Sequence, residues 1–276
     1  MLPKRDYWLQ QALLARLVVD LGVWISPETY SVLPLLVPFA VRDPDSKGNA
    51  GRGIPYRWGE VDDLGFLRDD NSMIKDKPYS LRVTGSNPLY SGKRIDKGFK
   101  ASHVWRRTTE AGHAARTPSL FSFVPNLVWL PGFLADMSDR EASFTQTYLQ
   151  AIAIHVYKDL EVSEQLRPWT ESAWASLPAP IGIPEEGLPD ASTLNFFEHS
   201  QSFVASRAAA VERISDALAA RAAGREPAPT RPSAFGRTLT SLDRRIAQER
   251  ADHLAKYAAA VRSAVEEHPI LEVSAQ

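Results

Sequence analysis

Apolar side chains recur every three to four residues in several stretches of the chain, and this spacing predicts helices with one buried face. In residues 6–23 the apolar stripe includes Leu9, Leu13 and Leu17. The same period predicts further helices at about 138–160, 193–221 and 241–267. Helices are therefore expected at both ends of the chain and in one segment of its middle.

Two serines mark places where helices are expected to begin. Ser26 stands before a proline, and proline is favoured at the first position of a helix, so we expect a short helix after Ser26. Ser138 and Glu141 have the spacing of a capping box, in which each side chain binds a backbone N–H of the first turn. The helix of residues 138–160 is expected to start there and to bury His155 in its apolar run.

The first half of the chain has a different pattern, with short apolar runs between turn residues. Residues 42–59 are dense in Gly, Pro, Asp and Asn, which predicts a loop. Short strands are predicted within residues 58–83, interrupted at Asp69–Ser72. Residues 121–130 are rich in aromatic and β-branched side chains, but Pro125 excludes one regular central strand, so we expect a strand, a break and a second short strand.

These elements predict an α+β fold. Residues 1–165 are expected to form a mixed α/β unit, in which residues 90–150 or so hold a strand–strand–helix element. Five prolines between positions 168 and 189 predict an irregular connection over 166–190. The composition then changes to Ala, Arg, Glu and Leu, which predicts a helical unit over 191–276.

Composition narrows the possible chemistry. With 276 residues, 44% of them hydrophobic and 24% charged, the chain has the composition of a folded globular protein. It has no cysteine, which excludes disulfides, thiolate zinc sites and a cysteine nucleophile, so a metal would need oxygen or histidine ligands. The first residues are too polar for a signal peptide and no apolar run is long enough to span a bilayer, so we expect a cytoplasmic protein without a membrane partner.

Charge is unevenly distributed along the chain. The formal net charge is −1, yet residues 89–116 contain seven basic residues against Asp96 and Glu110, a local charge of +5. Such a patch suits phosphate contacts, since each cation that neutralises a phosphate releases counterions; a solvated face on an ordinary enzyme is the alternative. The candidate nucleic-acid contacts are Lys93, Arg94, Lys97, Lys100, Arg106, Arg107 and Arg116, with Arg52 and Arg57 from the glycine-rich loop.

Within this patch the chain reads Ser102-His-Val-Trp105, and later Asn126-Leu-Val-Trp-Leu-Pro131. Over about residues 90–150, less than a quarter of the chain, it resembles the HNH, or ββα-metal, nuclease family. The resemblance implies that His103, at the end of a first strand, activates water, and that Asn126 on a second strand orients His103. A following helix would complete a metal site.

The metal implied by the resemblance is one Mg²⁺ or Mn²⁺ in each active site, which would polarise the phosphate. Asp136 and Asp139 lie about ten residues beyond the asparagine and are the expected ligands, together with Ser102. Ser102 stands where the family usually has an acid or a histidine. Asp139 also has a structural interpretation, as a favourable charge in the first turn of a helix.

The function implied by the resemblance is a metal-dependent endonuclease that hydrolyses double-stranded DNA, as a restriction or defence enzyme does. A homodimer would suit a nuclease that cuts two antiparallel strands. Two alternatives remain open: a nucleic-acid-binding protein without catalysis, and an interaction or assembly module built on the C-terminal helices. The sequence does not decide between DNA and RNA.

Other polar groups fit common sites less well. Asp69 and Asp70 with Lys75 and Lys77 lack the spacing of the other common restriction-nuclease fold, in which an acid stands two residues before the lysine. The acids of residues 60–63 lack the pattern of a calcium loop. His113, in a predicted loop, could touch a phosphate.

Overall fold

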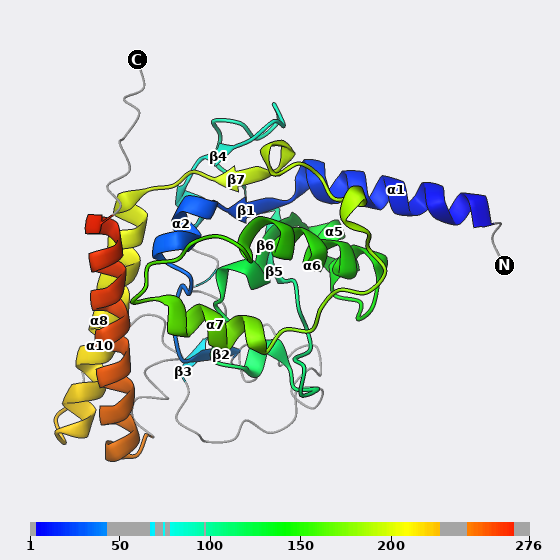
Figure 1. Cartoon of the computed structure of the whole chain (residues 1–276). Helices are drawn as coiled ribbons and strands as arrows, with labels where there is room; N and C mark the ends of the chain where they lie inside the picture. Colours follow the sequence, from blue (N-terminus) through cyan, green and yellow to red (C-terminus); the bar gives the residue numbers. More distant parts are fainter. Residues whose placement is uncertain are drawn as a thin grey trace.

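The computed structural model describes residues 4–42, 67–69, 74, 78–96, 98–226 and 242–267 (Figure 1). Three of the expected nucleic-acid contacts, Arg52, Arg57 and Lys97, lie outside these residues. The same holds for most of the glycine-rich loop, for the acids of residues 60–63, and for Asp70, Lys75 and Lys77.

A five-stranded sheet forms the centre of the molecule, with strand order β4-β7-β1-β6-β5. β7 is parallel to β1, and the other neighbouring pairs are antiparallel. A separate parallel pair joins β2 and β3. The strands are β1 (Val23–Ile25), β2 (Ala40–Arg42), β3 (Leu67–Asp69), β4 (Val83–Thr84), β5 (Phe99–His103), β6 (Leu127–Pro131) and β7 (Asn195–Phe197).

Helices surround this sheet and give the protein its α+β class. α5 and α6 lie over the sheet, α8 and α10 run side by side along one edge of the molecule, and α1 projects from the opposite edge (Figure 1). None of the helices in the described part of the chain is both long and apolar enough to cross a membrane. The helices are α1 (Lys4–Leu21), α2 (Pro27–Val32), α5 (Gly132–Ser138), α6 (Phe144–Tyr157), α7 (Arg167–Ala175), α8 (Gln201–Ala222) and α10 (Arg244–Glu267).

The short strands are held in place by a large aromatic core. Trp24 on β1 and Trp129 on β6 are both fully buried. Trp24 packs against Tyr157 of α6, and Trp129 packs edge-on against Phe197 of β7. All three residues of β1 are buried, as expected for a strand in the middle of a sheet that is covered by helices.

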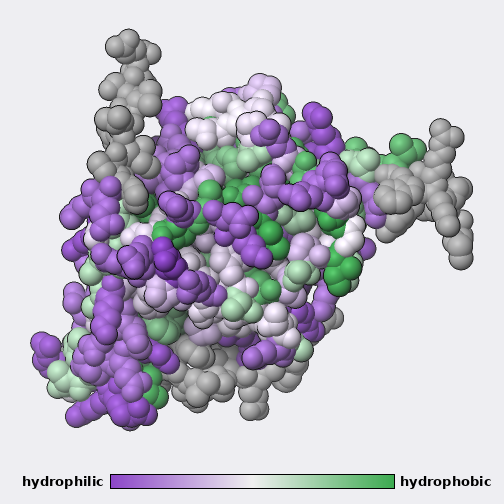
Figure 2. Space-filling view, viewed as in Figure 1, coloured by the Kyte–Doolittle hydropathy of each residue, from purple (hydrophilic) through white to green (hydrophobic). Residues whose placement is uncertain are grey.

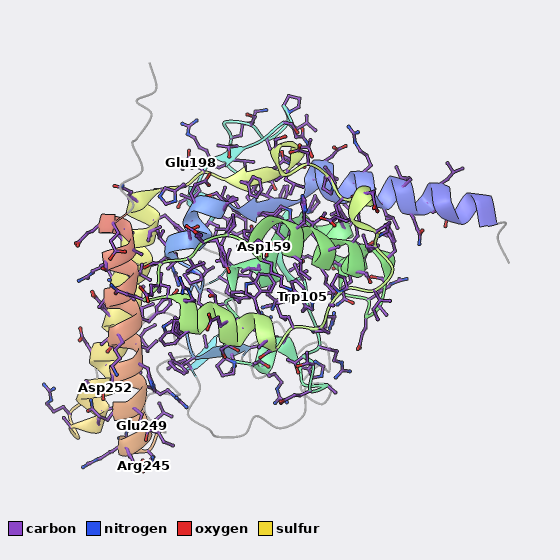
Figure 3. All side chains as sticks on the ribbon, viewed as in Figure 1. Trp105, Asp159, Glu198, Arg245, Glu249 and Asp252 are labelled. Atoms are coloured by element: carbon purple, nitrogen blue, oxygen red, sulfur yellow. The ribbon has the colours of Figure 1, made fainter. Side chains whose placement is uncertain are left out.

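The two long C-terminal helices confirm the helical part of the prediction. They share an apolar seam in which Leu218 and Leu254 are fully buried, and Ser215 donates a hydrogen bond to the Ala251 carbonyl across it. The outer surface of the pair is mostly hydrophilic (Figure 2). Arg245 and Glu249 form an ion pair of 2.7 Å near the outer end of α10 (Figure 3).

The start predicted for the middle helix is wrong. Ser138 is the last residue of α5, and its hydroxyl donates to the Ala135 carbonyl. α6 begins at Phe144, because Ser143 accepts a hydrogen bond from the Gln146 N–H and acts as the N-cap. Ser143 and Gln146 have the same capping-box spacing as Ser138 and Glu141, so the local signal occurs twice.

Three further predictions need correction. The first strand expected within residues 121–130 is absent, because the chain turns there and forms a 3₁₀ helix at Val124–Asn126 before β6. The connection predicted over 166–190 contains α7, whose proline stands in the first turn where a missing N–H costs nothing. His155 is exposed rather than buried, because it lies on the outer face of α6.

The C-terminal unit is tied to the sheet by a strand that the sequence pattern did not predict. β7 lies within the residues expected to be helical, and it pairs with both β1 and β4. α8 therefore begins at Gln201, after β7, instead of near residue 193. The predicted boundary at residue 191 separates this strand from its partners in the sheet.

Candidate functional site

β5, β6 and α5 form a strand–strand–helix element in the order expected for the candidate site. β5 and β6 pair over five residues, from Phe99 opposite Pro131 to His103 opposite Leu127. α5 starts at Gly132, directly after β6, and the Gly132 N–H donates to the Gly98 carbonyl at 3.0 Å. This bond fixes the start of the helix beside the start of β5.

His103 is the last residue of β5, and its half-buried ring is held by the backbone of another segment. Nε2 lies 2.9 Å from the carbonyl oxygen of Phe121, and the ring stacks on the Phe121 ring with centroids 5.5 Å apart. A carbonyl oxygen only accepts hydrogen bonds, so Nε2 carries the proton. In the neutral ring Nδ1 is then the basic nitrogen.

Asn126 is connected to His103 indirectly. Its fully buried carboxamide accepts a hydrogen bond from the Trp105 N–H at 2.7 Å and donates one to the Leu120 carbonyl at 2.9 Å. Leu120 precedes Phe121, whose carbonyl holds the imidazole. Asn126 therefore fixes the turn that positions His103, whereas the sequence predicted a direct bond from Asn126 to the ring.

The expected metal ligands lie towards α5. Lys100 on β5 reaches Asp136 of α5, with Nζ 2.9 Å from Oδ1. Because side chains alternate along a strand, Ser102 shares the face of Lys100, and His103 lies on the other face at the end of the strand. The Ser102 side chain is buried, with 6% of the residue exposed.

Two more ion pairs continue this contact beyond the end of α5. Arg106 Nη1 lies 3.2 Å from Asp139 Oδ1, and Arg107 Nε lies 3.0 Å from Glu141 Oε1. Asp139 is the C-cap of α5, so the predicted role as a first-turn charge is wrong. Residues 136–141 thus bring three carboxylates to three cations of the basic patch.

This donor set does not fit a divalent ion. Mg²⁺ requires several oxygen ligands in near-octahedral geometry, yet Asp136 and Asp139 each face a lysine or an arginine and Ser102 is a buried neutral hydroxyl. In the described part of the chain, no three His, Asp or Glu side chains are grouped closely enough to hold a metal. No chemical step is therefore assigned to a metal.

His113 adds an imidazole to the same surface. Arg107 Nη1 lies 3.4 Å from His113 Nε2, and Arg107 pairs with His113 through an isolated β-bridge. A guanidinium only donates, so Nε2 accepts and the ring is neutral. Burial lowers the His113 pKa, and the positive charges of Arg107, Arg116 and Arg106 lower it further.

The other basic candidates lie around this element. Lys93 and Arg94 are exposed on the segment between β4 and β5, where Lys93 Nζ donates to the Leu89 carbonyl. Arg116 ends the short 3₁₀ helix Ala114–Arg116. Trp105 of the patch is fully buried and packs against Trp174, so it belongs to the core (Figure 3).

Two groups of the site, Glu141 and the Phe121 carbonyl, are not among the residues predicted from the sequence. The capping-box spacing places Glu141 at a helix start, although its charge beside a basic patch also suits a partner for Arg107. Counted over residues 89–141, eight basic residues face five acids, so the local charge is +3 rather than +5. No sequence signal points to the carbonyl, because every residue has one.

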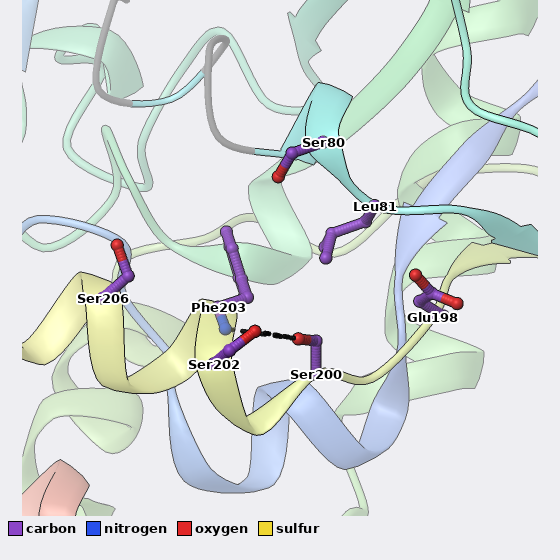
Figure 4. Close-up of a pocket in the computed structure, with 7 residues that line it drawn as sticks. All are labelled: Ser80, Leu81, Glu198, Ser200, Ser202, Phe203 and Ser206. Atoms are coloured by element: carbon purple, nitrogen blue, oxygen red, sulfur yellow. Dashed lines mark hydrogen bonds between the residues drawn. The ribbon is translucent and has the colours of Figure 1, made fainter.

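A cavity of about 250 Å³ lies elsewhere, where β7 leads into α8 (Figure 4). Ser200 caps α8 and bonds Ser202, while Glu198 Oε1 accepts the Arg82 N–H. These polar groups therefore have structural partners. The cavity is lined by Ser80, Leu81, Glu198, Ser200, Ser202, Phe203 and Ser206.

Comparisons with protein families, with curated proteins and with solved structures found no match to this chain.

Proposed function

We propose that the protein is a DNA endonuclease whose reaction takes place at the β5–β6–α5 element. The observation that supports this most is the His103 ring at the end of β5, fixed through Nε2 by the Phe121 carbonyl within a strand–strand–helix order. A histidine whose second nitrogen is held by a carbonyl has a defined tautomer and orientation, as a general base requires.

In this proposal His103 Nδ1 takes a proton from a water molecule. The water oxygen forms a bond to the phosphorus atom of a phosphodiester, and a phosphorus–oxygen ester bond breaks. The leaving oxygen keeps the electron pair of that bond and takes a proton from solvent, to which Nδ1 later returns its own. The products are a phosphomonoester end and a hydroxyl end. Asn126 acts as a positioning residue, because it fixes the Leu120 carbonyl next to the peptide that holds the ring.

The experiment compares cleavage of supercoiled plasmid DNA by the wild type, His103→Gln and His155→Gln. His155 is an exposed histidine on α6, outside the element, and serves as the matched control. We expect His103→Gln to lower the cleavage rate by about 10²–10⁴-fold, the usual contribution of a general base. The control should cleave as the wild type does.

Two results would contradict the proposal. Equal cleavage by wild type and His103→Gln would show that His103 is not the general base. Absence of cleavage by the wild type, with Mg²⁺, with Mn²⁺, without divalent ions, and on both methylated and unmethylated DNA, would remove the nuclease activity. The thermal unfolding of each variant shows whether a loss of activity follows from a loss of folding.

A second candidate is a nucleic-acid-binding protein that does not cleave. It is favoured by the pairing of Asp136 and Asp139 with Lys100 and Arg106, which leaves the expected metal ligands already occupied by cations. The same plasmid experiment separates the two functions, because this candidate predicts a mobility shift without nicked or linear products.

The proposal includes a cytoplasmic homodimer that acts on double-stranded DNA in restriction or defence. Two active sites related by a two-fold axis match the two antiparallel backbones of a duplex. Light scattering after gel filtration tests the dimer: a mass of twice the 30.6 kDa of one chain is expected, and a monomer in the presence of DNA would contradict it.

A further inference from the structure

Lys100 stands where the expected site would hold a divalent ion. It lies on β5 two residues before Ser102, on the face that meets α5, and its ammonium is 2.9 Å from the Asp136 carboxylate. We propose that the β5–β6–α5 element takes up no divalent ion and that Lys100 supplies the positive charge for a DNA phosphate instead. The phosphate as ligand rests on the proposed function, whereas the exclusion of the ion does not.

The backbone around Lys100 leaves a defined place for this side chain. Gly132 begins α5, and a Cβ atom added there would lie 3.4 Å from Lys100 Cε and 3.8 Å from Nζ. The lysine stem therefore runs alongside the first residue of the helix. Since the Gly132 N–H is bonded to the Gly98 carbonyl, strand and helix cannot separate locally without the loss of this bond.

A divalent ion would share each carboxylate that it used with a cation already paired to it. Asp139 is engaged by Arg106, and Glu141 is engaged by Arg107 through two contacts of 3.0 and 3.5 Å. The remaining ligand on this face is the hydroxyl of Ser102, a neutral oxygen. Mg²⁺ gives up its hydration water reluctantly. Carboxylates that are already paired with a lysine or an arginine therefore bind Mg²⁺ weakly.

A phosphodiester can replace the carboxylate as the partner of Lys100. It carries one negative charge, as Asp136 does, and therefore meets the same ammonium by the same ionic contact. The Lys100 and Asp136 side chains are 47% and 67% exposed, and ion pairs at such exposure exchange readily with water. Asp136 then holds the ammonium in place until a phosphate arrives.

The first test is a Mn²⁺ titration of the wild type and of Asp136→Asn, followed by the electron paramagnetic resonance signal of free Mn²⁺. We expect no site in either protein with a Kd below about 1 mM, the weak end of protein sites for hard cations. One tightly bound Mn²⁺ per chain that is lost in Asp136→Asn would overturn the proposal. This test requires no DNA and no activity.

The second test measures DNA affinity in EDTA for the wild type, Lys100→Met and Lys256→Met. Methionine keeps the apolar stem, and Lys256 is an exposed lysine of α10 that serves as the control. We expect Lys100→Met alone to bind about fivefold more weakly, the effect of one exposed ionic contact. Binding that requires a divalent ion, or equal weakening by both variants, would contradict the role of Lys100.

The two tests separate failure of this inference from failure of the proposed function. If the wild type neither binds nor cleaves DNA, the phosphate role of Lys100 fails together with the proposed function, but the Mn²⁺ titration still decides whether the element excludes the ion. If DNA is cleaved only with Mg²⁺ and Mn²⁺ binds at Asp136, the nuclease proposal stands and this inference is wrong.

Discussion

Two regions of the molecule contain ion pairs, but only in one of them does an ion pair lie beside a long apolar seam between two helices. Between α8 and α10, the ion pair of Glu212 and Arg262 lies beside an apolar seam in which Val211 and Leu254 are fully buried. In the β5–β6–α5 element, α5 has only seven residues, and three partly exposed ion pairs lie on it and on the residues that follow it. The first region would hold together without its charges.

Only one of these two regions is explained by its contribution to stability. Burial of apolar surface stabilises the helix pair, whereas exposed ion pairs contribute about 0–1 kcal/mol each. Stability therefore explains the residues between α8 and α10 but does not explain three ion pairs gathered on α5 and on the turn that follows it. Substitutions in the helix pair are therefore expected to change the free energy of unfolding, and substitutions around α5 are expected to change the affinity for ligands.

The largest effect is expected at the seam of the helix pair. Leu254→Ala removes a fully buried side chain and leaves a cavity, which should lower the free energy of unfolding by about 2–5 kcal/mol. Leu13→Ala is the matched control, because Leu13 on α1 is 61% exposed and should change this free energy little. Urea unfolding measures both, and equal effects would contradict the assignment of the seam as a core.

A smaller effect is expected for the buried amide of Asn126. Asn126→Ala leaves the buried Trp105 N–H without its partner and removes one of the two hydrogen bonds to the Leu120 carbonyl, which keeps the Phe123 N–H, at a cost of about 1–3 kcal/mol. Asn195, also fully buried and bonded to the Asp20 carbonyl, is the matched amide outside the element. Both alanine variants should be less stable when unfolded by urea.

The two asparagines should differ in their effect on His103. Only Asn126→Ala loosens the turn that holds Nε2, so only this variant should move the His103 ring signals in nuclear magnetic resonance spectra. If Asn195→Ala moves them equally, Asn126 has no specific positioning role and the region around β5 behaves as ordinary core.

The same two regions differ in how far they could be predicted from the sequence. α8 and α10 are long and periodic, so their existence follows from the pattern, although the start of α8 depends on β7. β7 has three residues, and its partner β1 lies about 170 positions earlier, so no local signal announces it. Tertiary pairing decides such short strands.

The candidate site was predictable only in part for a related reason. The order of strand, strand and helix around His103 agrees with the expectation, although Asn126 lies in the 3₁₀ helix before β6 and not on that strand. The basic patch follows from counting. The partners of the basic residues could not be predicted, because Asp136, Asp139 and Glu141 contact cations that lie 33–36 positions earlier in the chain. Sequence spacing gives no measure of such contacts between separate elements.

Two partly buried histidines, one before α8 and one beside the ion pairs that follow α5, should differ in how salt changes their pKa. His199 precedes α8 and its Nδ1 lies 3.0 Å from the Thr29 hydroxyl. Burial lowers the pKa of His199, and Glu28 partly offsets this. Burial also lowers the pKa of His113, with further lowering by three arginines. Added salt screens those arginines, so it should raise the His113 pKa and leave that of His199 nearly unchanged or slightly lower.

The pH dependence of stability follows from these directions. Both histidines bind a proton less readily in the folded state than in the unfolded chain. Their contribution is therefore complete above the unfolded pKa of about 6.5 and is lost as the pH falls below it. Histidine titrations by nuclear magnetic resonance at low and high salt, with urea unfolding at matched pH, provide the measurement. A salt-independent His113 pKa would contradict the arrangement of arginines around it.

The smallest effect on stability, and the sharpest test of the comparison, is expected at the surface of α5. Asp136→Asn breaks an exposed ion pair and should change the free energy of unfolding by less than about 1 kcal/mol. The same change frees Lys100 for a phosphate, so the magnitude of the slope of log affinity for DNA against log salt should rise by about one.

The control is Asp159→Asn. Asp159 is an exposed acid in the turn after α6 (Figure 3), so this variant loses the same charge but breaks no ion pair with a lysine of the patch. Equal slopes for the two variants would mean that only total charge matters. A steeper slope for Asp136→Asn alone, at unchanged stability, would mean that the carboxylate and the phosphate compete for the Lys100 ammonium. No such competition is expected for the Glu212–Arg262 pair beside the apolar seam of α8 and α10.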